Sequence, residues 1–150
     1  MKQIITKSFL ILLLFLSVNC GFKVINESEK NNFSIQEIKT SGNKRISFKI
    51  KNNLLSYSTK SDQNVLLINL VTKKNKSIKE KNIKNEITKY QISLNVNVKF
   101  NLINNNKDYK INISSEGDYL VNDSYSTTLN NEKKLIDNLT ENISEKIIKK

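Results

Sequence analysis

Strict alternation of apolar and polar residues over positions 90–102 is the feature that most constrains the fold of this 150-residue chain. In a β-strand, successive side chains point to opposite faces, so this pattern predicts a long strand with one face in the core and one in water. The apolar set is Tyr90, Ile92, Leu94, Val96, Val98, Phe100 and Leu102, and the polar set is Gln91, Ser93, Asn95, Asn97, Lys99 and Asn101.

The residues after this strand predict an antiparallel partner. Positions 104–108 read Asn-Asn-Asn-Lys-Asp, and Asn and Asp tolerate the left-handed backbone of a turn. The alternation resumes over residues 109–113, so the two strands are expected to form a hairpin. Gly117 and Asp118 predict a bend before Tyr119.

The first half of the chain predicts a strand, a helix and a second strand. Residues 33–38 indicate a short strand with an irregular alternation, through Phe33, Ile35 and Ile38. Residues 65–71 are almost continuously apolar, which predicts a strand buried on both faces. Two strands joined by a helix favour parallel pairing. The helix between them is indicated by an apolar stripe of Ile46, Ile50, Leu54 and Tyr57, widened by Phe48 and Leu55.

A second amphipathic helix is predicted at the end of the chain, with a stripe of Leu135, Leu139, Ile143 and Ile147. Asn130 is expected to cap this helix and Glu132 to lie in its first turn, while Lys149 and Lys150 complement the dipole at its end. The predicted order is β-α-β-β-β-α. We therefore expect an α+β two-layer sandwich, with both helices on one face of a four-stranded mixed sheet and a polar opposite face.

The composition excludes several kinds of chemistry. Histidine is absent, Cys20 is the single cysteine, and only three glycines occur. These counts exclude His-dependent catalysis, an internal disulfide and a cysteine cluster for zinc. No Gly-rich phosphate loop or Gly-x-Ser-x-Gly elbow is present, and the neighbouring Glu116 and Asp118 are typical of a surface turn. We expect a protein that is not an enzyme and that uses neither metal nor cofactor.

The N-terminus has the architecture of a secretory signal peptide. Lys2 and Lys7 precede an uncharged apolar run over residues 9–16, which is shorter than the roughly 20 residues of a membrane-spanning helix. Cys20 follows this run, in a context that resembles the lipobox of bacterial lipoproteins. We expect a signal peptide over 1–19, a lipidated tether over 20–32 and one domain over 33–150. The alternative is a free, buried Cys20 in an exported protein.

The chain is strongly basic, with a formal net charge of +11. Export argues against nucleic acid as the partner and favours anionic lipid head groups or a phosphorylated glycolipid. The charge is densest over residues 73–84, where six Lys accompany a single Glu. Because such a segment repels itself, we expect it to be an exposed loop or an extended strand end.

Four segments, in order along the mature chain, together resemble the LptE family of lipopolysaccharide-assembly lipoproteins, in particular its divergent alphaproteobacterial members. They are Cys-Gly-Phe at 20–22, the basic amphipathic helix at 43–55, the strand Thr-Lys-Tyr-Gln-Ile-Ser-Leu-Asn-Val at 88–96, and Tyr-Ser-Thr-Thr-Leu-Asn-Asn-Glu-Lys-Lys at 125–134. The resemblance implies a lipoprotein of the outer membrane, facing the periplasm, that plugs an LptD-like β-barrel and helps deliver lipopolysaccharide. The alternative is a lipoprotein that carries anionic lipid, or chaperones another envelope complex, without entering a barrel.

Lysines on the polar face of the predicted sheet are the candidates for contact with lipopolysaccharide phosphates. Lys99 is the first candidate, because it lies on the polar side of the long strand. Lys107 and Lys110 lie at or near the following turn, and Lys73, Lys74 and Lys76 follow the apolar run at 65–71. The alternative for each is a solvated charge that contributes only to solubility.

Overall fold

The computed structural model describes residues 33–59, 64–105 and 107–149. The predicted signal peptide, the tether and Cys20 lie outside the described residues. The elements follow the expected order, which confirms the α+β prediction. They are β1 (Ser34–Gly42), α2 (Lys44–Tyr57), β2 (Val65–Lys81), β3 (Ile87–Leu102), β4 (Lys107–Leu120) and α3 (Tyr125–Ile148).

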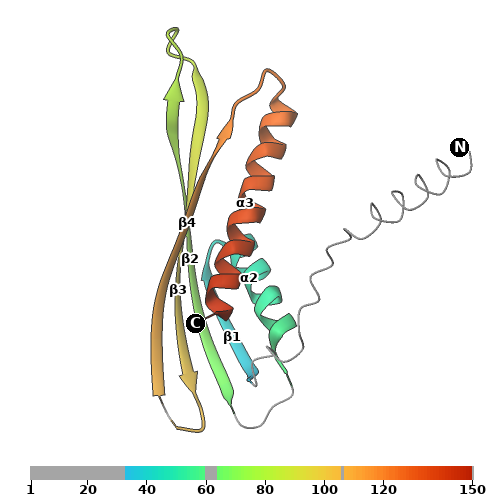
Figure 1. Ribbon diagram of the computed structural model, residues 1–150, viewed down its shortest axis with the longest axis vertical. Helices are drawn as coiled ribbons and strands as arrows, with labels where there is room; N and C mark the ends of the chain where they lie inside the picture. The colour runs from blue at the N-terminus through green and yellow to red at the C-terminus, as the bar shows by residue number, and fades with distance from the viewer. Residues whose placement is uncertain (1–32, 60–63, 106, 150) are drawn as a thin grey trace, which may run out of the picture.

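The four strands form one mixed sheet in the order β1-β2-β3-β4, and both helices cover the same face (Figure 1). β1 and β2 are parallel, with α2 as their connection, whereas β2–β3 and β3–β4 pair in antiparallel fashion. The expected hairpin of β3 and β4 is therefore confirmed. The charged segment 73–84 continues β2 as far as Lys81, so it is mainly an extended strand end.

The core lies between the helices and the sheet. The even-numbered residues of the middle of β3 are buried, as the alternation predicts, and they pack against the apolar stripes of α2 and α3. The buried apolar residues are Ile38, Ile46, Ile50, Leu54, Ile68, Leu70, Ile92, Leu94, Val96, Val98, Tyr119, Leu139, Ile143 and Ile147. No helix of the described residues is long and apolar enough to cross a membrane.

Two expectations about burial are wrong. The apolar run of β2 is buried on one face only, since Ile68 and Leu70 face the helices whereas Val71 is 48% exposed. The helices cover a single face of the sheet, so the side chains of this run that point to the other face remain at least partly exposed to solvent. In α2 the buried stripe ends at Leu54, and Tyr57 in the last turn is exposed.

β4 is continuous through Gly117, so the bend predicted there is wrong. The glycine instead allows α3 to approach the strand closely, because a Cβ at this position would lie 2.7 Å from Leu135 Cδ1.

The start of α3 also differs from the expectation, because the helix begins at Tyr125 with Ser124 as its N-cap, ahead of Asn130. The hydroxyl of Thr128 explains this earlier start. It accepts a hydrogen bond from the backbone N–H of Asn122 at 2.9 Å and so ties the first turn to the preceding loop. Glu132 consequently lies inside the helix and not in its first turn.

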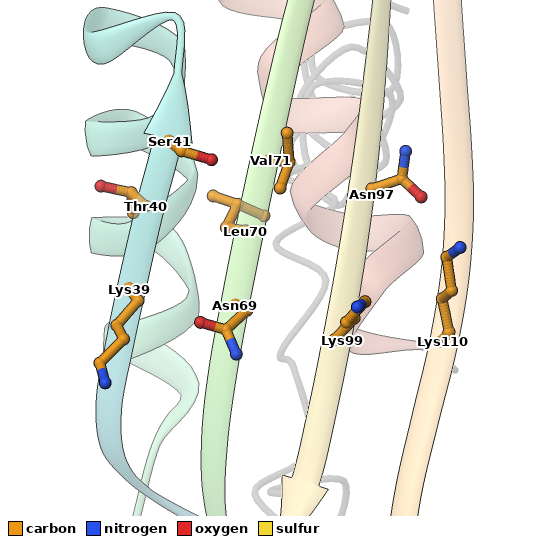
Figure 2. A pocket seen from close by; sticks show the side chains of 9 residues that line it. All are labelled: Lys39, Thr40, Ser41, Asn69, Leu70, Val71, Asn97, Lys99 and Lys110. Carbon is orange, nitrogen blue, oxygen red and sulfur yellow. The ribbon is translucent and has the colours of Figure 1, made fainter.

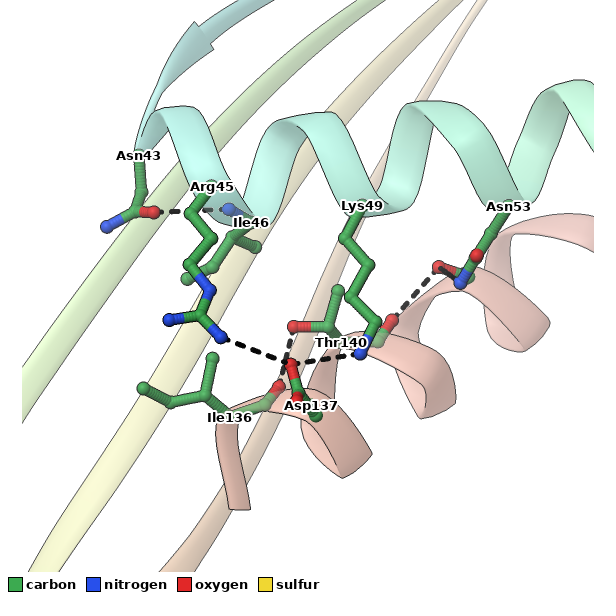
Figure 3. A network of polar contacts seen from close by, with 9 residues as sticks. Asn43, Arg45, Ile46, Lys49, Asn53, Ile136, Asp137 and Thr140 are labelled. Atoms are coloured by element: carbon green, nitrogen blue, oxygen red, sulfur yellow. Dashed lines mark hydrogen bonds and ion pairs between the residues drawn. The ribbon is translucent and has the colours of Figure 1, made fainter. Parts of the chain in front are cut away.

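The two helices are joined by polar contacts along their shared edge (Figure 3). Asp137 of α3 pairs with Lys49 at 2.9 Å and with Arg45 at 4.0 Å, and the Asn53 amide donates to Ser144 Oγ at 3.2 Å. Asn43 caps α2 by accepting from the Ile46 N–H at 3.2 Å. The contacts of Asp137 and Asn53 link the two helices above the sheet.

Candidate functional site

The open face of the sheet carries a row of side chains that crosses all four strands (Figure 2). Strand register pairs Lys39 of β1 with Asn69 of β2, Asn69 with Lys99 of β3, and Lys99 with Lys110 of β4. We call Lys39, Asn69, Lys99 and Lys110 the lysine row. It places two predicted candidates, Lys99 and Lys110, directly opposite each other on neighbouring strands.

The lysine row lies along a shallow hollow of about 480 Å³. Ser41, Val71 and Asn97 line the hollow beside it, and their side chains are exposed on the same face (Figure 2). The hollow therefore offers ammonium, hydroxyl and amide groups to a ligand. Phosphate oxygens accept hydrogen bonds from all three of these groups.

The charge arrangement in the row is unfavourable for the protein alone. Like charges directly opposite each other on neighbouring strands destabilise a sheet. Among the described residues, Lys99 and Lys110 form no ion pair, and Lys39 has only the exposed Glu37 at 3.5 Å, a type of contact that contributes little. An anion bound between these lysines would relieve the repulsion.

Sequence reasoning did not identify Lys39 as a member of this row. The β1–β2 register shifts between Ile35 and Glu37, so the alternation of β1 is interrupted there. That shift is the irregularity visible in the sequence around Ile38. If the alternation is counted from Ile35, Lys39 is expected on the same face as Ile35, towards the helices. If it is counted from the buried Ile38, beyond the shift, Lys39 lies on the open face.

The remaining candidates do not join the row. Lys73 shares the open face but stands four positions along β2 from Asn69, roughly 13 Å away at the rise of a strand. Lys107 is opposite Leu102 and therefore lies on the face that carries the helices, at the end of the sheet. Lys74 and Lys76 are also on the helix-bearing face, beneath α3.

Lys74 and Lys76 belong to a second polar group, the glutamate cluster, formed by Lys74, Lys76, Tyr90, Tyr119 and Glu132. The Glu132 carboxylate accepts from Lys76 at 2.7 Å, from Lys74 at 3.4 Å and from the Tyr119 hydroxyl at 2.8 Å. The Lys76 ammonium lies 4.3 Å from the centre of the Tyr90 ring, within the range of a cation–π contact. The glutamate cluster ties α3 to the long β2–β3 hairpin.

The pKa shifts in the glutamate cluster follow from these contacts. Burial alone would raise the pKa of Glu132, but the hydrogen bonds and charges of Lys76, Tyr119 and Lys74 lower it below its ordinary value. Burial alone would lower the pKa of Lys76, but its hydrogen bonds and charge interactions with Glu132 and Tyr119 raise the pKa above its ordinary value. Burial raises the pKa of Tyr119. Both lysines already pair with Glu132, so they are poorer candidates for an external anion than the lysine row.

The described part of the chain contains no group of three acidic side chains placed to hold a metal ion. The charged groups that the lysine row offers on the open face are the ammonium groups of Lys39, Lys99 and Lys110. Those groups are exposed and can reach a large anionic partner.

No protein-family model matches the chain, and no curated protein matches it in sequence. Solved structures of bacterial lipoproteins share its fold. Rare lipoprotein B from Shewanella oneidensis is 14% identical, with a TM-score of 0.60 over 79% of this chain and 92% of that one. The lipoprotein B structure from Nitrosomonas europaea is 14% identical, with a TM-score of 0.57 over 85% and 88%.

A minor lipoprotein from Acinetobacter baumannii is 11% identical, with a TM-score of 0.51 over 78% of this chain and 92% of that one. All three of these structural neighbours are described as lipoproteins, and two of them as lipoprotein B. At these identities the likeness concerns the fold alone. The resemblance to LptE-type lipoproteins found in the sequence is thereby confirmed at the level of the fold.

Proposed function

We propose that this protein is an outer-membrane lipoprotein, anchored through Cys20, that plugs and assists an LptD-like β-barrel and helps deliver lipopolysaccharide. The observation that carries the proposal is the lysine row, a line of basic side chains across an open polar sheet face. Lipopolysaccharide carries phosphate groups, and lysine ammonium groups bind phosphates as point charges.

The shape of the molecule supports a position inside a barrel. One sheet face is covered by the helices and the other is polar, with exposed Asn, Ser and Lys side chains along β3 and β4. The interior of a wide membrane barrel is polar and lined by water, so such a face can remain hydrated there. The similarity in fold to lipoproteins agrees with an anchor at the N-terminus.

The first test is a pull-down of the tagged, full-length lipoprotein from gently solubilised outer membranes. We expect one large β-barrel protein in stoichiometric amount. Recovery of lipid without a barrel would overturn the plug role and favour the alternative, a lipoprotein that carries anionic lipid.

The second test addresses the lysine row. Replacing Lys39, Lys99 and Lys110 together by Glu should weaken lipopolysaccharide binding by roughly tenfold or more, because several exposed charge contacts are lost. The matched control replaces Lys133, Lys134 and Lys146, three exposed lysines of α3, by Glu. An equal loss in both variants would show that only net charge matters and would refute the site.

A further inference from the structure

The second hollow of the molecule is an apolar groove on the helix-bearing face, at the end of the sheet where the described chain begins. Its volume is about 530 Å³, within the range of roughly 300–1,000 Å³ typical of ligand pockets. Apolar side chains from every element contribute to its lining. They include Ile35 of β1, Leu54 of α2, Leu66 of β2, Leu102 of β3, Ile111 of β4 and Ile147 of α3.

The groove exists because the sheet is longer than its cover. β2, β3 and β4 extend past the end of α3 at the lower end of Figure 1. Apolar side chains also form the rim there, with Tyr109 52% exposed and Ile103, in the β3–β4 turn, 43% exposed. Apolar surface is thus exposed to the solvent directly beside an apolar groove, a combination that is typical of a binding site.

A positive charge stands beside this rim. Lys107 pairs with Leu102 across β3 and β4 and lies two residues before Tyr109, on the same face of the sheet. Its neighbour Asp108 is on the opposite face, where it accepts a hydrogen bond from Asn101 at 2.7 Å. The groove therefore combines an apolar interior with a cation next to its mouth, which matches a ligand with an apolar chain and an anionic head.

We propose that the apolar groove binds one acyl chain of an anionic phospholipid, with the phosphate of that lipid at Lys107. This inference rests on the proposed function, because the lipid anchor would place the groove near a membrane that supplies the phospholipid. Cys20 precedes the groove residue Phe33 by 13 positions, so at most about 45 Å of extended chain separates the groove from the anchored leaflet. Because the groove is limited to about 530 Å³, the proposal places a single acyl chain in it and leaves the rest of the lipid outside.

The test of the groove uses the mature chain from residue 20 with Cys20→Ser, titrated with lysophosphatidylglycerol below its micelle concentration and followed by calorimetry. Leu102→Trp, which fills the groove, should weaken binding by about tenfold or more, because several methylene groups lose their burial. Leu129→Trp, at an exposed apolar position of α3, is the matched control and should bind as before. Undiminished binding by a folded Leu102→Trp protein, checked by circular dichroism, would overturn the proposal.

The role of Lys107 is tested separately, with a variant at an exposed position. Lys107→Glu should weaken binding of lysophosphatidylglycerol several-fold and leave binding of an uncharged monoacylglycerol of the same chain length unchanged. Lys133→Glu makes the same change of charge on exposed α3 and should affect neither probe. Equal loss of both probes in Lys107→Glu, or loss of neither, would refute the assignment of the phosphate.

Two further comparisons separate this inference from its alternatives. The lipidated protein could fail to bind lysophosphatidylglycerol while the Cys20→Ser protein binds it. In that case the groove is occupied by the acyl group of the protein itself, and the phospholipid assignment is wrong. A failure of the β-barrel pull-down with intact lysolipid binding would contradict the proposed function and leave the groove standing. Recovery of the barrel without any lysolipid binding would contradict the groove and leave the proposed function standing.

Discussion

Glu132 shows how a single carboxylate holds two parts of the molecule together. It is located on α3, its side chain is 16% exposed, and its partners Lys74 and Lys76 come from the projecting part of β2. Tyr119 of β4 donates to the same oxygen that accepts from Lys76. A charge removed from water in this way is stable only while its partners remain, so each member of the cluster depends on the others.

The charge of Glu132 should therefore stabilise the fold in a pH-dependent way. Because its folded-state pKa is lowered, this contribution is complete above its ordinary pKa of about 4.5 and is lost as the pH falls through the lower folded value. Glu132→Gln should cost about 1–3 kcal/mol at pH 7 and progressively less in acid. Urea unfolding of both proteins at pH 7 and pH 3 measures this difference. An equal cost at both pH values would contradict the electrostatic explanation.

Single residues also show where sequence reasoning reaches its limit. Lys99 and Lys110 could be assigned to one face because the alternation on β3 is strict and that on β4 resumes after the turn. Lys74 and Lys76 could not be recognised as partners of Glu132, because that contact joins residues almost 60 positions apart. Such pairs depend on where α3 crosses the sheet, and no local pattern contains that information.

At the scale of elements, periodicity predicted the existence of helices and strands better than their ends or their surroundings. Apart from the exposed Tyr57, the stripes of α2 and α3 are correct, because burial of one helix face has a period that the sequence displays. The apolar run of β2 led to a wrong expectation, because a continuous run does not show how many faces are covered. The start of α3 was missed because the sequence of residues 125–128 is typical of a loop. In the structure, the hydrogen bond that the Thr128 hydroxyl accepts from the Asn122 N–H stabilises the first turn.

The docking of α3 gives a prediction at this scale. Leu139 is buried between the helix and the sheet, so Leu139→Ala should cost about 2–5 kcal/mol through lost burial and the cavity left behind. Leu129→Ala removes the same atoms from an exposed position of the same helix and should cost far less. Thermal melts of the two variants compare them directly, and similar melting temperatures would mean that α3 is not docked as described.

At the scale of the whole molecule, the two candidate surfaces have different chemistry and lie on different faces. The lysine row is on the open face of the sheet, whereas the apolar groove is on the helix-bearing face at the end where the N-terminal segment enters. A lipid anchor at Cys20 would keep the apolar groove near the membrane, because Cys20 precedes the groove residue Phe33 by 13 positions.

This organisation requires that Cys20 is the lipidated residue. Cells given labelled palmitate should incorporate the label into the wild-type protein, and Cys20→Ser should abolish it, because only that residue has the thiol directly after the apolar signal segment. The double variant Cys20→Ser, Ser28→Cys restores a thiol eight positions away and should stay unlabelled. Label on either variant would show that acylation does not depend on the position of Cys20. The anchor, and with it the placement of the groove near the membrane, would then be wrong.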